Sequence, residues 1–511
     1  MKKRIVLCVA ASVAWTVVGA TLDGAKPITY EAFGAVGDGR TDDRKAIMAA
    51  HAAANEKGLP VRAKDGATYY MGCGGGTAII RTDVDFGTAT FIIDDTHVAN
   101  PNIRSAAFSI ETDEPTFAVT GLVKLVQGQK SLGVRLPKRC LLKLVDGNVK
   151  RFIRWGRNRN NGVAQQEMII ADRDGLVDPA TPLVWDFDHV TDVTGWPIDE
   201  KLLTVRGGSF TNIANQAKSQ YRYHSRGILV HRSNVRIEGL KHYVAGELDH
   251  GAPYTGFVCI EHCANVTLYK CLFTARRTYE TIGAAGKPVS MGSYGLTVGH
   301  AVNVSFIGCR QTTDIVDGRY WGLFGSNFCR NILFDDCVFS RFDAHMGVAN
   351  ATIRNSTLGY AGVQAIGFGT LLIENSTIRS RNALVSLRSD YGSSWKGDII
   401  IRNCTFAPCN APRDGVPPLL NGFNVAEHDY GYDCCMPRRF VVEGLTIEDA
   451  KHSQKQDLYV FGTFRKMDVK PVRPYPVTEE VVLRNVKTAS GRTLKTSRNE
   501  EMFRNVRIIR E

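Results

Sequence analysis

One short phrase recurs between residues 265 and 406 and constrains the fold more than any other feature. Each copy alternates apolar and polar residues and then turns at a small residue, as in NVTLYKCLF (265–273) and NVSFIGCRQ (303–311). The turning residues stand 38, 28, 19, 20 and 28 residues apart, at Cys271, Cys309, Cys337, Ser356, Ser376 and Cys404. A strand-length repeat at this period, without helical periodicity between copies, is typical of a β-solenoid. Because one coil cannot bury its inner face alone, neighbouring coils must stack.

The uneven spacing of the copies predicts a groove. If the strands stay in register, every residue beyond the shortest coil leaves the wall as a loop, and the 19- and 20-residue coils leave almost none. Long coils on either side then form walls, which we expect in 274–293 and 388–397, above a floor at 340–347. The functional site is predicted in this groove.

The chain is predicted to begin with an export signal and then to divide into three parts. Residues 1–20 combine a basic end, an apolar run and a small-residue cleavage site, which is typical of a cleaved signal peptide. No later segment approaches the length of a membrane-spanning helix. We therefore expect a secreted or periplasmic bacterial protein, with an N-terminal cap and first coils in 21–99, an inserted or appended β region in 100–200, and the main β-helix in 201–511.

The N-terminal cap carries a longer motif, FGAVGDGRTDDRKAI (33–47), ahead of an alanine-rich helix. We expect Thr41 to be the N-cap of that helix and Gly58 to end it. The motif resembles the head of the pectate-lyase-like superfamily of right-handed parallel β-helices, in which this segment caps the open end of the solenoid. The resemblance implies that fold and a carbohydrate substrate, and we interpret Asp38, Asp42 and Asp43 as structural.

The resemblance does not transfer a catalytic residue. The arginine motif of calcium-dependent pectate lyases is absent from the sequence, and the one match to the polygalacturonase motifs is Asp335-Asp336. Asp336 occupies the repeat position of Asn355, Asn375 and Asn403, which predicts a corner of the coil.

Residues 150–172 are predicted to form a β-hairpin that turns at 160–162. Its basic residues have two interpretations, a rim that binds a polyanion or a solvated hairpin face; they are Lys150, Arg151, Arg154, Arg157 and Arg159.

The net charge indicates which classes of partner the protein binds, and the cysteines indicate which disulfides could form. The formal net charge of +12 favours acidic partners, with a merely basic surface as the alternative. For an exported protein the candidate partners are acidic polysaccharides and anionic surfaces, and we do not expect nucleic acid as a partner. The cysteines of the repeat column are predicted to be reduced and buried, because free cysteine packs as a small hydrophobe. For Cys409, Cys434 and Cys435 a disulfide and a free thiol are equally compatible with the sequence.

In three successive coils the first strand begins with Tyr294, Trp321 and His345, respectively. We predict that these residues form one column that binds sugar rings; the alternative is an aromatic ladder inside a turn. Polar residues of both signs are dense around them. The residues predicted to bind substrate are Tyr294, Trp321, Asp314, Asp317, Arg341, Arg388, Asp390 and Tyr391, and those predicted to be catalytic are His345, Tyr320, Arg319 and Asp343.

Two reactions fit these residue types. Elimination from a uronate needs its carboxylate neutralised, by Arg319, Arg388 or a cation such as calcium, and a proton-transfer group such as His345 or Tyr320. Hydrolysis needs two facing carboxyl groups, with Asp314, Asp317 and Asp343 as candidates. A binding protein without catalysis needs neither. We predict a right-handed parallel β-helix that is a polysaccharide lyase, with a glycoside hydrolase and an adhesin as the alternatives; no cofactor other than calcium is suggested.

Overall fold

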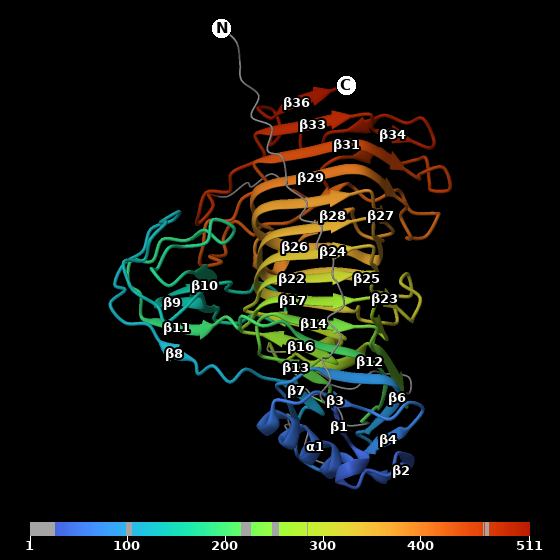
Figure 1. Cartoon of the computed structure of the whole chain (residues 1–511). Coiled ribbons are helices and arrows are strands. Elements are labelled where there is room, and N and C mark those ends of the chain that lie inside the picture. Colours follow the sequence, from blue (N-terminus) through green and yellow to red (C-terminus); the bar gives the residue numbers. More distant parts are fainter. Residues whose placement is uncertain are drawn as a thin grey trace.

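A stack of parallel strands forms the body of the molecule. The computed structural model describes residues 26–98, 105–215, 226–247, 255–283, 285–462, 464 and 470–511, so the predicted signal peptide lies outside the described residues. The main sheet has 28 strands that pair in parallel from coil to coil, which confirms the predicted right-handed parallel β-helix (Figure 1). Within the described ranges, no helix is long and apolar enough to cross a membrane.

Each coil has three walls. The first wall carries the apolar part of the repeated phrase; its separate strands are β1 (Ile28–Thr29), β3 (Val61–Arg62), β14 (Val235–Glu238), β17 (Ala264–Tyr269), β22 (Val302–Ile307), β33 (Glu480–Arg484) and β36 (Arg507–Arg510). The second wall follows the small turning residue; it comprises β2 (Asp38–Asp42), β4 (Thr68–Met71), β15 (Lys241–Ala245), β18 (Leu272–Phe273), β23 (Arg310–Gln311), β27 (Thr377–Ile378) and β34 (Lys487–Thr488).

The third wall precedes the next copy of the phrase. Its strands are β5 (Ala78–Ile80), β7 (Phe108–Ile110), β13 (Ile228–Val230), β16 (Val258–Glu261), β21 (Leu296–Gly299), β28 (Val385–Leu387) and β30 (Leu420–Asn421). Longer strands continue around a corner into the next wall; they are β6 (Val84–Asp94), β12 (Leu203–Ile213), β24 (Phe324–Asp335), β25 (Val338–Arg354), β26 (Thr357–Glu374), β29 (Trp395–Phe406) and β31 (Arg439–Ile447).

The interior of the coils is one continuous apolar core. Alternate residues of each strand point inward, as the period of two requires, so that Val304 and Phe306 in β22 stack on Val266 and Leu268 in β17. Each fully buried side chain of this kind contributes about 1.5–3 kcal/mol. The core is therefore distributed along the whole stack rather than concentrated at one point.

Ladders of identical side chains occupy the corners. One ladder joins the side-chain amides of successive coils over 2.9–3.3 Å, through Asn234, Asn265, Asn303, Asn331 and Asn350. All five have positive φ, a conformation that asparagine tolerates better than most residues. At another corner Asp336 has φ 52°, like Asn355 at 52° and Asn375 and Asn403 at 48°, which confirms that Asp336 is a corner residue.

The twelve described cysteines are all free thiols. Cys271, Cys309, Cys337 and Cys404 are buried, which confirms the reduced ladder. Cys409, Cys434 and Cys435 are free as well, so the disulfide considered for them does not form in this structure.

The N-terminal cap is helix α1 (Arg44–Lys57), preceded by the short 3₁₀ helix η1 (Glu31–Phe33). The predicted N-cap at Thr41 is wrong: Thr41 belongs to β2, and Asp43 is the residue before the helix. The Asp43 carboxylate instead accepts hydrogen bonds from the backbone of Val36 at 2.6 Å and Gly37 at 3.1 Å, which is a structural role. Gly58 ends the helix with φ 64°, as predicted.

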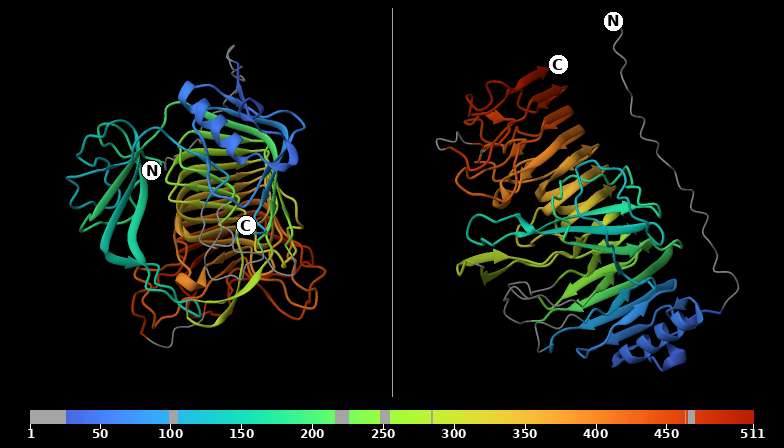
Figure 2. Two further views of the ribbon diagram at one scale, coloured as in Figure 1. Left: turned by 90° about the horizontal axis from the view of Figure 1, so that it is seen from below. Right: turned by 90° about the vertical axis from the view of Figure 1, so that its left-hand side faces the viewer.

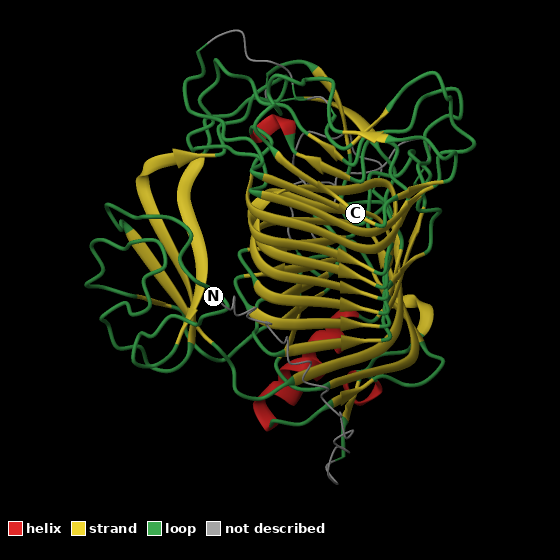
Figure 3. Cartoon of the chain, turned by 90° about the horizontal axis from the view of Figure 1, so that it is seen from above, coloured by secondary structure: helices red, strands yellow, loops and turns green. Residues whose placement is uncertain are grey.

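A four-stranded antiparallel sheet stands beside the solenoid, which confirms the inserted β region of the predicted fold (Figures 2 and 3). Its strands are β8 (Phe117–Ala118), β9 (Cys140–Arg151), β10 (Val163–Ala171) and β11 (Asp192–Pro197). The sheet has its own apolar core. It is tied to the corner between the third and first walls by an ion pair between buried Glu167 and Arg330 and by a 2.8 Å hydrogen bond between His300 and Gln166.

Smaller elements are the hairpin β19 (Tyr279–Ile282) and β20 (Pro288–Met291), the pair β32 (Leu458–Tyr459) and β35 (Leu494–Lys495), and the 3₁₀ helix η2 (Ser389–Tyr391).

Candidate functional site

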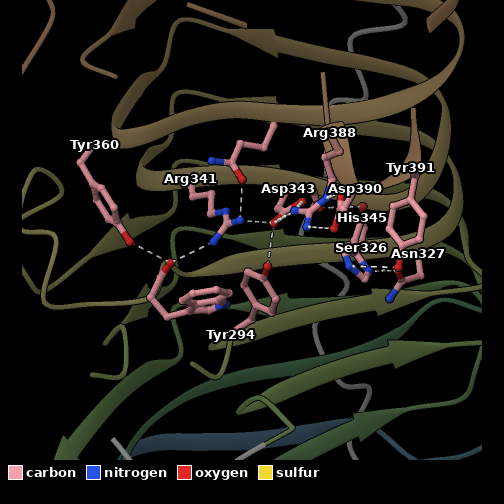
Figure 4. A network of polar contacts seen from close by, with 12 residues as sticks. Tyr294, Ser326, Asn327, Arg341, Asp343, His345, Tyr360, Arg388, Asp390 and Tyr391 are labelled. Atoms are coloured by element: carbon pink, nitrogen blue, oxygen red, sulfur yellow. Dashed lines mark hydrogen bonds and ion pairs between the residues drawn. The ribbon is translucent and has the colours of Figure 1, made fainter. Parts of the chain in front are cut away.

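Asp343 lies on the outer face of the third wall, yet its side chain is 0% exposed. Three side chains cover it (Figure 4). Tyr294 donates a hydrogen bond to Oδ2 at 2.7 Å, Arg341 Nη2 lies 2.5 Å from the same oxygen, and Arg388 Nη1 lies 2.9 Å from both oxygens. A buried carboxylate needs such partners, because an unpaired charge in the protein interior is strongly destabilising.

The charges around Asp343 keep the carboxylate ionised. Burial opposes ionisation, but the nearby guanidinium groups of Arg341 and Arg388 outweigh it and lower the pKa of Asp343 to about 2. Burial, together with the neighbouring Asp343 carboxylate, raises the pKa of Tyr294. Burial favours loss of the Arg388 proton, but Asp343 and Asp390 outweigh it, so the pKa of Arg388 is raised. The cluster therefore remains charged at neutral pH.

A glycine makes room for Tyr294. A Cβ atom on Gly325 would lie 2.7–2.9 Å from ring atoms of Tyr294, so only glycine allows the ring to lie flat over β24 and reach Asp343. Arg341 is held in turn by Gln364 at 2.6 Å and by the backbone carbonyl of Trp321 at 3.2 Å. Its guanidinium lies over the Tyr294 and Trp321 rings, 5.5 and 5.0 Å from their centres.

His345 lies two residues beyond Asp343 and is neutral. Its Nδ1 is 3.2 Å from Oδ1 of Asn327, and its Nε2 is 3.5 Å from the Tyr391 hydroxyl. Burial, and then the positive charge of Arg388, lowers the pKa of His345 to about 3. If Nδ1 donates its proton to Asn327, the lone pair is on Nε2, whose contact with Tyr391 is at the outer limit of a hydrogen bond. Such an imidazole is available to accept a proton.

The inserted sheet contributes a residue to this cluster. The chain that leaves β9 runs across the solenoid, where the Ile153 amide donates to the Tyr430 carbonyl at 3.1 Å and the Trp155 amide donates to the Asp390 carbonyl at 2.9 Å. These contacts place Arg154, whose Nη2 lies 2.8 Å from Asp390. Asp390 also pairs with Arg388 at 3.0 Å. The solenoid and the insertion therefore share one ion-pair network.

Two cavities open on either side of Arg154 and Arg388, which line both. The smaller, of about 350 Å³, is lined by His345, Asn327, Tyr294, Trp321, Glu261 and the end of β20. The larger, of about 660 Å³, is lined by Arg381, Asn382, Ser386, Asn421 and Phe423. One outward column of the third wall runs beneath both: Thr297 pairs with Gly325, and Asp343, Gln364, Ser386 and Asn421 pair in succession, while the next residues Ser326 and Ala344 join the two sets. The cavities thus form a groove parallel to the solenoid axis.

Eight of the twelve predicted site residues meet in this network: Tyr294, Trp321, Arg341, Asp343, His345, Arg388, Asp390 and Tyr391. The other four lie on the loop 312–322 outside the two cavities. Arg319 is 74% exposed and pairs with Asp317 at 2.6 Å, and Asp314 binds the backbone of Val316. Tyr320 meets the network through its backbone carbonyl, which accepts a hydrogen bond from Tyr360.

The predicted column of Tyr294, Trp321 and His345 is wrong. Tyr294 and Trp321 are neighbours, with ring centres 6.2 Å apart, but His345 follows the position that pairs with Ser326 in the preceding coil. The register between β24 and β25 shifts between Ser326 and Asn327 of β24, which pair with Ala344 and Met346, so that His345 is the extra residue on β25. His345 therefore lies beside Tyr391, with ring centres 5.2 Å apart, instead of beside Trp321.

Several residues of the site escaped the sequence interpretation. Arg154 was one of five basic residues of a hairpin, and no local pattern distinguished it from the other four. Asn327, Gln364 and Glu261 stand at outward positions of third-wall strands, where the alternation alone identifies them as exposed. Arg381 and Phe423 lie on turns without a repeated phrase. These residues come together only through the strand register between coils, so that register is the signal that could have identified them.

The described residues contain no cluster of three or more His, Cys, Asp or Glu side chains placed to hold a metal ion.

The fold is similar to that of two phage tailspikes. The chain resembles the tailspike protein gp49 of Pseudomonas phage LKA1, at 12% identity and a TM-score of 0.51 over 90% of this chain and 81% of that one. It also resembles the gp54 tailspike of Acinetobacter baumannii bacteriophage AP22, solved with A. baumannii capsular saccharide, at 10% identity and a TM-score of 0.52 over 96% and 82%. No family model matches the chain.

One curated protein matches in sequence. A depolymerase of Klebsiella phage P510, specific for capsule KL64, is 28% identical over 101 residues. The matched stretch covers 17% of this chain and 10% of the depolymerase. The similar structures support the parallel β-helix that the cap motif implied, and none of these similar proteins is described as pectate-lyase-like.

Proposed function

We propose that the protein cleaves an acidic polysaccharide by β-elimination in the groove over the third wall. The observation that carries this proposal is the charge balance of the network. Within the described part of the chain, Arg154, Arg341 and Arg388 form ion pairs with two carboxylates, those of Asp343 and Asp390. One positive charge remains beside neutral His345, and a bound uronate carboxylate would balance it.

The reaction follows from these positions. Arg388 and Arg154 neutralise the substrate carboxylate, which lowers the cost of removing the proton from the carbon that bears it. Nε2 of His345 takes that proton, and the electron pair forms a double bond to the neighbouring ring carbon. The bond from that carbon to the glycosidic oxygen breaks, and the leaving oxygen takes the proton back from the imidazolium.

Substrate binding would also raise the pKa of His345. Arg388 disfavours the imidazolium in the empty groove. A bound carboxylate offsets that positive charge, so the pKa of His345 rises towards the range in which histidine transfers protons well. Asp343 has no exposed surface for the substrate. We assign it to positioning, since it fixes Arg341, Arg388 and Tyr294.

The likeness to tailspikes and the match to a capsule depolymerase support a polysaccharide as the substrate class. Hydrolysis is the second candidate. Of the candidates from the sequence, Asp343 is fully buried and Asp314 and Asp317 do not line either cavity, whereas Glu261 lines the smaller cavity and Asp390 the larger one. A secreted or periplasmic location remains the hypothesis that the sequence of residues 1–20 suggests.

The test compares acidic polysaccharides with their carboxyl-reduced forms, using the wild-type protein and His345→Gln. Ultraviolet absorbance of an unsaturated uronate and the release of reducing ends are followed together. Elimination predicts both signals with the acidic polymer, neither with the reduced polymer, and a loss of at least about a hundredfold in His345→Gln. Reducing ends without absorbance would establish hydrolysis, and binding without either signal would establish a non-catalytic adhesin.

A further inference from the structure

The larger cavity contains a set of side chains that the elimination step does not use. Arg381 lines this larger cavity, whereas His345 lines the smaller cavity. Its guanidinium carbon is 5.2 Å from the centre of the Tyr360 ring. Among the residues that the structure describes, Arg381 contacts this aromatic ring and forms no ion pair with a carboxylate. Arg381 therefore adds to the lining of the cavity a positive charge that is not paired with a carboxylate.

The lining of this cavity is positive and rich in amide groups. Arg154, Arg381 and Arg388 line it together with one carboxylate, that of Asp390. Gln364, Ser386 and Asn421 form its floor on successive coils, which lie about 4.8 Å apart. Amide and hydroxyl side chains at this spacing suit the hydroxyl groups of a sugar.

An aromatic wall completes the cavity. Phe423 lines it and is backed by Trp155 of the insertion, with ring centres 5.8 Å apart. Trp155 is held by its backbone hydrogen bond to Asp390. The ring of Phe423 thus adds an apolar surface to a lining that is otherwise largely polar, and a sugar ring has one polar edge and one apolar face.

From this lining we infer that the larger cavity is a non-catalytic subsite for a second acidic sugar residue, in which Arg381 binds the charged group and Phe423 contacts the apolar face. The inference rests on the proposed function, because it takes the ligand to be the same polysaccharide. Cleavage then requires one acidic sugar residue of the substrate in this subsite and another beside His345. Short oligosaccharides that do not reach Arg381 would be poor substrates.

Binding, rather than catalysis, tests the inference. Acidic capsular hexasaccharides and their carboxyl-reduced counterparts are titrated by calorimetry into His345→Gln protein, which binds without turnover. Arg381→Gln in this background is expected to weaken binding of the acidic form about tenfold or more and to leave the reduced form unchanged, because a charge-assisted hydrogen bond is lost. Arg381→Lys keeps the charge and is expected to retain most of the preference.

A matched control lies two residues away. Arg379 is exposed and does not line either cavity, so Arg379→Gln makes the same change in net charge and is expected to leave both affinities unchanged. Equal weakening of the acidic and reduced forms by Arg381→Gln would show a structural role through Tyr360 and would overturn the inference. If the unmodified groove does not prefer the acidic form at all, the acidic substrate of the proposed function fails; an unchanged preference in Arg381→Gln overturns the subsite alone.

Discussion

The replacement Asp343→Asn tests whether the buried carboxylate organises the groove. It removes the charge that pairs with Arg341 at 2.5 Å and with Arg388 at 2.9 Å, and it leaves two poorly exposed guanidinium groups facing a neutral amide. Breaking a buried ion pair by removing one partner costs about 3–5 kcal/mol. Gln364 and Asp390 remain as partners of the two arginines, so the lower part of this range is expected.

The matched control is Asp317→Asn. Asp317 pairs with Arg319, whose side chain is 74% exposed, and a surface ion pair of this kind contributes about 0–1 kcal/mol. Both variants remove one carboxylate near the same coil and change the net charge equally. They differ in the burial of the carboxylate and in the number of side chains that bind it.

Thermal unfolding measures the difference. A chain of this size has an unfolding entropy of about 1 kcal/mol per kelvin, so a loss of ~3 kcal/mol lowers Tm by about 3 °C if the chain unfolds as one unit. The shift is larger if only the coils around residue 343 unfold together. Asp317→Asn is expected to shift Tm by less than about 1 °C. Equal shifts in the two variants would show that the buried network does not stabilise this part of the solenoid.

Further outcomes follow from the same geometry. Glu167→Gln leaves Arg330 buried without its charged partner, so we expect a loss of about 3–5 kcal/mol and faster proteolysis of the insertion; unchanged proteolysis would contradict the coupling of the two parts. Gly325→Ala places a Cβ atom against the Tyr294 ring, which we expect to cost about 1–3 kcal/mol and to lower activity, whereas an unchanged activity would show that the Tyr294–Asp343 bond is dispensable. Because burial and Arg388 lower the pKa of His345 to about 3, its base form persists as pH falls from 8 to about 4; kcat/KM is expected to show no inflection near pH 6.5, and an inflection there would exclude this imidazole as the base in the free protein.

The same depressed pKa has a consequence for stability. In the unfolded chain His345 binds a proton near pH 6.5, but in the folded protein it does so only near pH 3. The unfolded state therefore binds more protons between these values, and this residue makes folding less favourable as pH falls from about 6.5 to 3. Asp343 acts at lower pH: its lowered pKa of about 2 stabilises the fold above about pH 4, and this contribution is lost as pH falls towards 2.

The repeated phrase was sufficient to predict the solenoid because its chemistry is local. Alternating apolar residues, a small buried residue at the turn and an asparagine or aspartate at the corner recur in each copy, and each has the same role in every coil. The positive φ of Asp336, Asn355 and Asn403 shows this directly. The fold follows from such a pattern without knowledge of any distant contact.

The site depends on two facts that no local pattern contains. The register irregularity between Ser326 and Asn327 moves His345 away from Trp321, and a count of residues along the sequence places it wrongly. Arg154 reaches Asp390 from a separate sheet more than two hundred residues earlier in the chain. Residues 312–320 looked equally suitable by composition, but their loop leaves the wall and pairs its charges at the surface, as Asp317 and Arg319 do.

The mass of the products released from an acidic polysaccharide tests the proposed elimination most directly. The wild-type protein is expected to release oligosaccharides whose new end carries a carbon–carbon double bond and is lighter by one water molecule than a hydrolysis product. His345→Gln is expected to bind the same polymer and release none. Products that retain the full mass of water, or unsaturated products released at an undiminished rate by His345→Gln, would contradict elimination by His345 in this groove.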